Sequence, residues 1–422
     1  MTTTTEIRKA PPIAVLSIIV SMGLLGVGNG HLFAYVPVRL AAEGQPPWVA
    51  GAVVTALAIG AFVGCMIAGF VVRRVGHARA FAACSAGVIL SVLMIAPAVD
   101  PYLWIASRFL YGVATSGLFI VSQSWLNDAS PNNWRGKVIG AFYMLYVVAI
   151  GFGGYLIRFI ELDGAQAPLL AIFFVALGIL PVCLTRLPSP PPPASISIAV
   201  RSVWRISPVG LVGMLSVGGL TMLVQGFTPI YVSQAGYAKD DVGLLVLLMQ
   251  FGMIAIQYPL GALSDRVDRR LVLIGASMLI VVFAWYAGTL DLGSFAVVAV
   301  VFAIWAGATE TIYSVANAHA NDRADPEYFV SLSSTMLIAW SLSGIVFPGL
   351  ATALTPYLGP TAFIDVAIVL SVAYGGFVIF RITRRSSVPD ADTGVHQPIS
   401  AQAPYSAELS PQLGDDTRYD RD

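Results

Sequence analysis

Residues 242–270 read VGLLVLLMQFGMIAIQYPLGALSDRVDRR. The part from 242 to 263 contains no charged residue, and a cluster of charged residues follows it directly, from Asp265 to Arg270. A bilayer core about 30 Å thick requires about 20 apolar residues in a spanning helix. This stretch therefore predicts a transmembrane helix that ends in a charged loop at the membrane surface.

The same pattern of an apolar run and a short polar break occurs twelve times. We expect spanning helices near residues 13–38, 48–72, 79–98, 102–126, 136–160, 167–186, 208–232, 242–263, 271–290, 295–318, 330–354 and 361–382. Of the 422 residues, 57% are hydrophobic and 11% are charged, whereas soluble domains carry charge on about a quarter of their residues. The composition excludes an ordinary soluble protein and predicts an all-α integral membrane protein. The formal net charge of zero gives no reason to expect nucleic acid as a partner.

Lys and Arg are distributed unevenly between alternate loops. If the amino terminus is cytoplasmic, nearly all of the 23 basic residues fall on the cytoplasmic side, only Arg39, Arg158 and Lys239 fall on the opposite side, and Arg108 lies within a helix. Cytoplasmic loops carry an excess of Lys and Arg. We therefore expect both termini in the cytoplasm.

The longest internal loop divides the chain into two halves of six predicted helices, residues 13–186 and 208–382. This loop, residues 187–207, contains five prolines and then Arg201 and Arg205, and we expect a cytoplasmic linker. Its part from 196 to 206 is either a short basic amphipathic helix on the lipid surface or a solvated loop. We expect residues 1–12 to form a cytoplasmic segment and the polar residues 383–422 to form a disordered cytoplasmic tail.

Two short motifs recur in the two halves. Gly69-Phe-Val-Val-Arg73-Arg74 corresponds to Gly261-Ala-Leu-Ser-Asp265-Arg266, and Asn127-Asp128 corresponds to Asn321-Asp322, at offsets of 192 and 194 residues. Similar offsets at two places indicate an internal duplication. Parallel repeats of six helices place a solute cavity at their interface, near the bilayer midplane.

Residues 261–270 resemble the cytoplasmic signature loop of the major facilitator superfamily, with Asp268 where that pattern usually has glycine. In the first copy of the loop, Arg73 stands where the acidic residue would be. The stretch Arg108-Phe-Leu-Tyr-Gly112 is similar to the fourth-helix motif of the superfamily, which is associated with proton coupling. The YcaD-like branch of uncharacterised bacterial members is similar at Ser124-Trp125-Leu126-Asn127, at Trp134-Arg135-Gly136 and at residues 318–323.

The resemblance implies two pseudo-symmetric six-helix bundles in a bacterial inner membrane, with helices 1, 4, 7 and 10 around a central cavity. It also implies a secondary active transporter that moves a small organic solute by alternating access and is coupled to protons. We expect a monomer without a cofactor. Two other classes are a membrane-embedded enzyme and a transporter-like sensor. Three isolated cysteines and four scattered histidines offer neither a nucleophile set nor a metal site for an enzyme, and the tail is too polar and short to be the output domain of a sensor.

Few ionisable residues lie within the predicted helices. A charge near the bilayer centre costs several kcal/mol, so Arg108 and Glu310 are candidates for function. Arg108 offers a fork of donors suited to a carboxylate or phosphate, or it controls a proton site, and Glu310 is the expected proton carrier. The alternative is an arginine paired with backbone carbonyls and a glutamate hydrogen-bonded between helices.

Other polar residues are candidates for the substrate and proton pathway, although each could instead join two helices by a hydrogen bond. Asn29 and His31 lie about 200° apart on a helix, so they cannot both face the cavity. The remaining candidates are Gln225, Gln123 and Tyr313, followed by Tyr143, Tyr146, Gln250, Gln257 and Trp340.

Charged residues at the cytoplasmic helix ends are candidates for a gate. An ion pair that forms in only one conformation would bias alternating access. The alternative is that these charges only orient the chain in the membrane. The gating candidates are Asp265, Arg266, Arg269, Arg73, Arg74 and Asp128.

Overall fold

The computed structural model describes residues 12–97, 99–130, 132–185, 198–289, 293–325, 328–384, 394, 396 and 399–401. Twelve helices within these ranges are long and apolar enough to span a membrane. The all-α membrane fold predicted from the apolar runs is therefore confirmed. The segment 1–11, the proline-rich part of the linker and most of the tail lie outside the described residues.

The first half consists of α1 (Pro12–Ala42), α2 (Pro47–Val75), α3 (His77–Met94), α4 (Pro101–Ala129), α5 (Asn132–Tyr155), the short helix η1 (Leu156–Phe159) and α6 (Gln166–Leu184). Proline is the first residue of α2 and of α4, where its missing N–H costs nothing. The Asp100 carboxylate caps α4 by accepting the Leu103 N–H at 2.7 Å. Between α2 and α3 the chain reverses at a single residue, Gly76, whose φ of 81° favours glycine.

The second half begins with the linker helix α7 (Val200–Ile206), so residues 200–206 form a helix and not an irregular loop. One span follows in three parts: α8 (Pro208–Met222), the π-helical turn η2 (Leu223–Phe227) and α9 (Thr228–Gln234). The remaining helices are α10 (Lys239–Ser264), α11 (Arg269–Thr289), α12 (Phe295–Asn321), α13 (Phe329–Leu358) and α14 (Ala362–Ile382). A π turn inside an α-helix is frequently found at a functional site.

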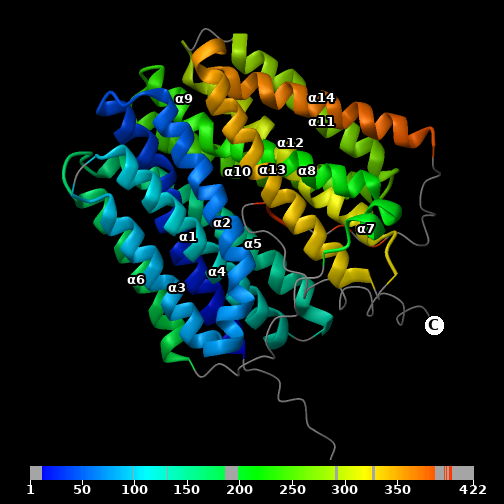
Figure 1. Ribbon diagram of the computed structural model, residues 1–422, viewed down its shortest axis with the longest axis horizontal. Helices are drawn as coiled ribbons and strands as arrows, with labels where there is room; N and C mark the ends of the chain where they lie inside the picture. Colours follow the sequence, from blue (N-terminus) through cyan, green and yellow to red (C-terminus); the bar gives the residue numbers. More distant parts are fainter. Residues whose placement is uncertain are drawn as a thin grey trace, which may run out of the picture.

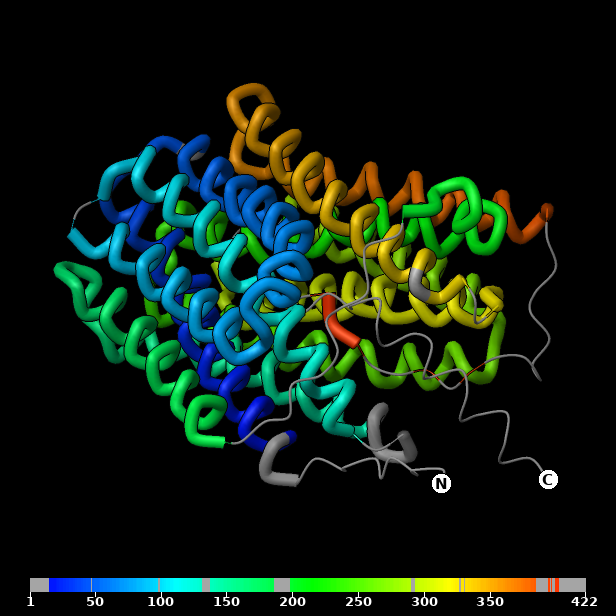
Figure 2. Tube along the Cα trace, turned by 60° about the horizontal axis from the view of Figure 1, so that its bottom comes forward, coloured from blue at the N-terminus to red at the C-terminus, as the bar shows by residue number. Residues whose placement is uncertain are grey.

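The helices form two bundles, with α1–α6 in one and α8–α14 in the other (Figure 1). Each bundle contains an even number of spans, so α1 begins and α14 ends on the same side of the molecule. We call this the terminal side and the opposite side the far side. In both views the tail residues 399–401, drawn in red, lie between the two bundles (Figures 1 and 2).

Close helix contacts join the bundles near the far side. A Cβ atom on Gly51 of α2 would lie 2.1 Å from the Thr352 hydroxyl oxygen of α13, and one on Gly154 of α5 would lie 2.5 Å from Val246 of α10. Such approaches need glycine, because any side chain would overlap the neighbouring helix. These contacts close the far side of the interface.

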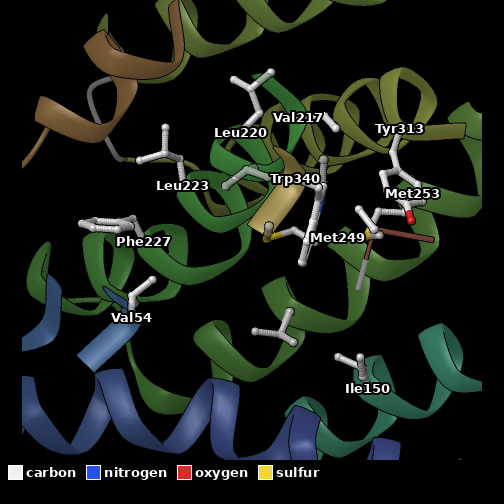
Figure 3. Packing of buried hydrophobic residues seen from close by; sticks show 14 of the residues in the cluster. Val54, Ile150, Val217, Leu220, Leu223, Phe227, Met249, Met253, Tyr313 and Trp340 are labelled. Carbon is white, nitrogen blue, oxygen red and sulfur yellow. The ribbon is translucent and has the colours of Figure 1, made fainter. Parts of the chain in front are cut away.

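Apolar side chains fill the interface between these contacts. Figure 3 shows Val54 and Ile150 of the first bundle on one side of Phe227, Met249 and Trp340 of the second, and all five are buried. The interface core therefore draws on both halves of the chain.

Candidate functional site

A central cavity lies between the bundles. It offers about 120 Å³ to the centres of water-sized molecules, enough for several waters or one small solute. Most of its wall is apolar and comes from both halves, including Val53, Val54 and Leu57 of α2 and Ile230 of α9. The tail residue Ala401 also lines it.

Arg108 supplies the one positive charge among the described residues that line this cavity. The residue is 5% exposed, and its Cζ atom lies 5.0 Å from the centre of the Tyr111 ring, one turn further along α4. Its Nε atom is buried without a hydrogen-bond partner in the described part of the chain, and no described carboxylate forms an ion pair with it. A buried cation normally requires a partner, so this guanidinium is chemically suited to an anion that enters the cavity.

Polar side chains beside Arg108 form a connected network. The Tyr111 hydroxyl donates to Asn29 Oδ1 at 2.9 Å, and Asn29 Nδ2 donates to the Tyr146 hydroxyl at 2.8 Å. All three residues line the cavity. The network links α1, α4 and α5 and fixes the Asn29 amide against the Arg108 wall.

Gln225 lies on the opposite wall, within the π turn η2. Its Oε1 accepts from Gln250 Nε2 at 3.1 Å, and its Nε2 lies 2.9 Å from the sulfur of Met253. The nearby Trp340 lines the same cavity, and its indole nitrogen has no hydrogen-bond partner among the described residues. This wall therefore offers polar groups to a solute without offering charge.

Glu310 lies on α12 and is 1% exposed. One of its carboxylate oxygens accepts the main-chain N–H of Ala401 at 2.7 Å, and the Ser400 side chain also hydrogen-bonds to this carboxylate. Because Ala401 lines the central cavity, the tail connects Glu310 to the space that contains Arg108.

Three other predicted pathway residues lie outside the lining of the central cavity. His31 is fully buried and stacks on Tyr35, with ring centres 6.3 Å apart. Gln123 donates to the Tyr143 hydroxyl at 3.1 Å between α4 and α5. Tyr313 lines a smaller cavity beside Asn317 and Trp340.

The charged loop after α10 forms an ion-pair cluster with the end of α12. Arg269 Nε lies 2.6 Å from Asp322 Oδ2, and Arg269 Nη1 lies 3.6 Å from Asp265 Oδ1. Burial raises the pKa of the Asp322 carboxyl, although the Arg269 charge opposes this shift. Asp268 pairs with Arg270 at 2.6 Å, and although burial alone would raise the pKa of Asp268, the hydrogen bonds and charge of Arg270 lower it below its ordinary value.

The first copy of the signature loop has no equivalent cluster among the described residues. Arg73, Arg74 and Asp128 are exposed, as is Arg266 in the second copy, and none of the four forms an ion pair with another described residue. The structure thus brings together Asp265 and Arg269 but not the corresponding residues of the first half.

Sequence reasoning did not assign Tyr111 or Asp322 to the site. Tyr111 follows Arg108 by three residues, a spacing that places both on one helix face and that could have identified it. Asp322 belongs to the repeated Asn-Asp pair, but nothing in the sequence indicates that Arg269 is its ion-pair partner. The contact of Ala401 with Glu310 joins residues far apart in the chain and had no sequence signal.

Two bundles of similar construction around a central cavity define a membrane transporter fold. The sequence model of the Major Facilitator Superfamily matches residues 14–240 and 209–412, and the chain belongs to this superfamily. Among curated proteins, an uncharacterized MFS-type transporter YcaD of Escherichia fergusonii is 23% identical over 89% of this chain and 98% of its own length. A YcaD of Salmonella newport is 25% identical over 81% and 88%.

Solved structures share the fold at lower sequence identity. A point mutant of the nucleoside transporter NupG superimposes with a TM-score of 0.68 at 14% identity over 88% of this chain and 99% of its own. A D-xylose-proton symporter gives a TM-score of 0.64 at 13% identity over 89% and 98%. The human organic anion transporter MFSD10 gives 0.60 at 16% identity over 87% and 100%. The two-bundle architecture predicted from the repeat is confirmed.

Proposed function

We propose that this transporter moves a small organic anion with an apolar body across a bacterial inner membrane, by alternating access and coupled to protons. The observation that carries the proposal is the Arg108 guanidinium, which faces the central cavity without a carboxylate partner among the described residues. A solute carboxylate or phosphate would fill this role, and the apolar wall of α2 would accommodate the rest of the molecule.

Glu310 is the proposed proton carrier. It is a buried carboxylate of the second bundle, near a cavity whose positive charge among the described residues belongs to the first bundle. A carboxylate that releases its proton on one side of the membrane and takes one up on the other can couple the proton gradient to the rocking of the bundles. Asp265, Arg269 and Asp322 are the proposed gate, because their pairs join α10, α11 and α12 at the terminal side.

Binding of organic anions to the purified protein tests the anion site. The probes are benzoate, hexanoate and hexylphosphonate, each compared with its neutral amide or alcohol by thermal stabilisation in detergent. We expect the anions to stabilise the protein and Arg108→Gln to weaken their apparent affinity at least about tenfold, because a hydrogen bond to a charged group contributes about 1.5–3 kcal/mol. Arg158→Gln is the matched control, since Arg158 is exposed near the far side. Equal stabilisation of the wild type and Arg108→Gln would contradict the proposal.

Transport in proteoliposomes tests the proton step. With a bound anion as solute, we expect Glu310→Gln to lose accumulation driven by a proton gradient but to keep exchange of labelled for unlabelled solute, because exchange needs no net proton movement. Asp365→Asn is the control, since this carboxylate is exposed at the start of α14. Full accumulation by Glu310→Gln would assign the coupling to another group.

A further inference from the structure

Part of the carboxyl-terminal tail lies inside the transporter. The described tail residues are Gly394, His396, Ile399, Ser400 and Ala401, which we call the strap. Ile399, Ser400 and Ala401 are 8%, 3% and 0% exposed, as buried as the helix core. The composition predicts a disordered tail from residue 383 onward, yet this part of it packs between the bundles (Figure 2).

The strap makes its first contacts at the ion-pair cluster of the terminal side. The Gly394 N–H donates to Asp322 Oδ1 at 3.0 Å, and the Gly394 carbonyl accepts from Arg269. The His396 N–H donates to Asp265 Oδ1 at 2.8 Å. The strap therefore binds the same three charged side chains that pair with one another in the proposed gate.

The strap then passes between α5 and α10. The Ile399 carbonyl accepts from Gln257 Nε2 at 2.8 Å. Ile399 and Ser400 line a small cavity together with Gly140, Tyr143 and Met144 of α5 and with Tyr258 of α10. These helices contact each other directly nearer the far side, at Gly154 and Val246, so the strap fills the space between them on the terminal side.

The innermost described strap residue, Ala401, hydrogen-bonds to the proposed proton carrier, Glu310. Ala401 donates its N–H to Glu310 and also lines the central cavity. Residues 394–407 contain no charged side chain, whereas Asp390 and Asp392 precede them and Glu408 follows. An uncharged segment enters a site at membrane depth at a much lower cost than its charged flanks would. The uncharged stretch of the tail thus includes the tail residues that the structure describes inside the transporter.

We propose that the strap is an autoinhibitory plug. While it is bound, it closes the path from the terminal side to the central cavity, it occupies the carboxylate that would exchange protons, and it keeps the terminal-side halves of α5 and α10 apart. In alternating access, the terminal side must close when the far side opens, and this closure requires the terminal-side parts of α5 and α10 to approach each other. The strap must therefore leave before the transporter can turn over. This proposal rests on the proposed function only for the transport measurements, because the alkylation measurements need no solute.

Access to a thiol between α5 and α10 tests the plug without any solute. A Cβ atom on Gly140 meets no atom within 4 Å, so Gly140→Cys fits in a chain whose Cys65, Cys84 and Cys183 are replaced by alanine. We expect a hydrophilic maleimide to react with this thiol at least about tenfold faster after deletion of residues 386–422 than in the full chain. Deletion of residues 403–422, which keeps the strap, should leave the rate unchanged. Asp325→Cys, in an exposed loop of the terminal side, should react equally in all three chains.

A point substitution separates the strap from the rest of the tail. Ala401→Pro removes the N–H that Glu310 accepts, whereas Ala401→Gly keeps it. We expect the proline variant to react as fast as the deletion and the glycine variant to react like the parent. Equal alkylation rates with and without the strap would overturn the plug.

Transport measurements then test inhibition itself. In proteoliposomes, exchange of an anion identified by the binding assay should become several-fold faster after deletion of residues 386–422. Faster alkylation with an unchanged exchange rate would overturn autoinhibition. If no variant moves any solute, the proposed function fails, while the alkylation rates still decide whether the strap closes the path.

Discussion

Arg108 is the residue on which the chemistry of the central cavity depends. It lies beside the Tyr111 ring, and the Tyr111 hydroxyl is committed to Asn29. The network therefore holds the wall around the guanidinium without neutralising its charge. A rigid, preorganised pocket of this kind lowers the cost of ordering side chains when an anion binds.

The Tyr111 hydroxyl offers a test of this arrangement. Tyr111→Phe keeps the ring beside Arg108 but leaves Asn29 Oδ1 without its donor, and we expect a loss of about 1 kcal/mol in the free energy of unfolding. Denaturation in mixed detergent micelles measures this change in the free energy of unfolding. Tyr102→Phe on the same helix, 76% exposed, should change little. Anion affinity should fall less than in Arg108→Gln, and an equal loss of affinity in the two variants would mean that the guanidinium is not the main anion-binding group.

Residue types and helical spacing predicted part of the site. Arg108 and Glu310 could be identified because charge is rare and costly at membrane depth. The orientation of neutral polar residues could not, because an apolar helix gives no periodic signal that separates a cavity face from a packing face. Thus Asn29 lines the cavity, whereas His31, two residues further, packs against Tyr35.

Hydropathy predicts every spanning helix of the described residues but not where each one ends. The first helix was expected to end at residue 38 and continues to Ala42. Arg39 extends it, because its guanidinium pairs with Glu43 at 2.6 Å and also contacts Asp163 at the far side. The π turn at residues 223–227 was not predicted, since it arises from tertiary packing and leaves no pattern in the apolar run.

Two glycines of α5 test how closely the helices pack. A Cβ atom on Gly153 would lie 1.9 Å from the Val27 carbonyl oxygen of α1, whereas one on Gly140 would meet no atom within 4 Å. We expect Gly153→Ala to destabilise the protein by about 3 kcal/mol or more, because α1 must shift away. Gly140→Ala should be neutral or stabilising by up to about 1 kcal/mol, since alanine favours the helix. The fraction that remains monodisperse after heating in detergent compares them, and equal stability would mean that α1 and α5 are less tightly packed.

For the whole molecule, the strap shows the limit of prediction from sequence. Its contacts with Asp265, Gln257 and Asp322 are made through main-chain N–H and C=O groups, which every segment of a protein carries. Glu310 likewise accepts a main-chain N–H, from Ala401, in addition to its hydrogen bond with the Ser400 side chain. A polar composition correctly indicates that such a segment cannot form its own core. It does not indicate that the segment binds to a groove built by other helices.

Strap binding should weaken in acid. Burial lowers the pKa of His396 to about 4 from 6.5, with the Asp265 charge opposing the shift and the Arg269 charge adding to it. Because the bound strap holds the imidazole neutral, binding is at full strength above pH 6.5 and weakens as the pH falls from 6.5 toward 4. Between pH 7.5 and 5.5 we expect roughly tenfold weaker binding. Burial raises the pKa of Asp322, whereas the Gly394 N–H that the strap donates opposes this shift.

Alkylation of Gly140→Cys at several pH values measures this effect. Each rate is divided by that of Asp325→Cys at the same pH, which removes the pH dependence of the thiol itself. His396→Gln should abolish the remaining dependence, because glutamine does not titrate. A normalised rate that stays constant from pH 7.5 to 5.5 in the parent protein would show that His396 does not control strap binding.

The far-side contacts bear on whether the two bundles separate during transport. A Cβ atom on Gly349 of α13 would lie 3.9 Å from Thr55 Cγ2 of α2, so side chains at these two positions touch across the far-side interface. In the chain without native cysteines, the pair Thr55→Cys and Gly349→Cys should therefore cross-link on oxidation.

Alternating access requires the far side to open, so we expect the cross-linked protein to lose anion exchange and to recover it on reduction. Each single variant should be insensitive to oxidation. Because the strap lies at the other end of α5 and α10, the alkylation rate of Gly140→Cys is measured in protein without the far-side cross-link. Exchange at the full rate by the cross-linked protein would mean that solute crosses without separation of α2 from α13, and the rocking of two bundles would have to be abandoned.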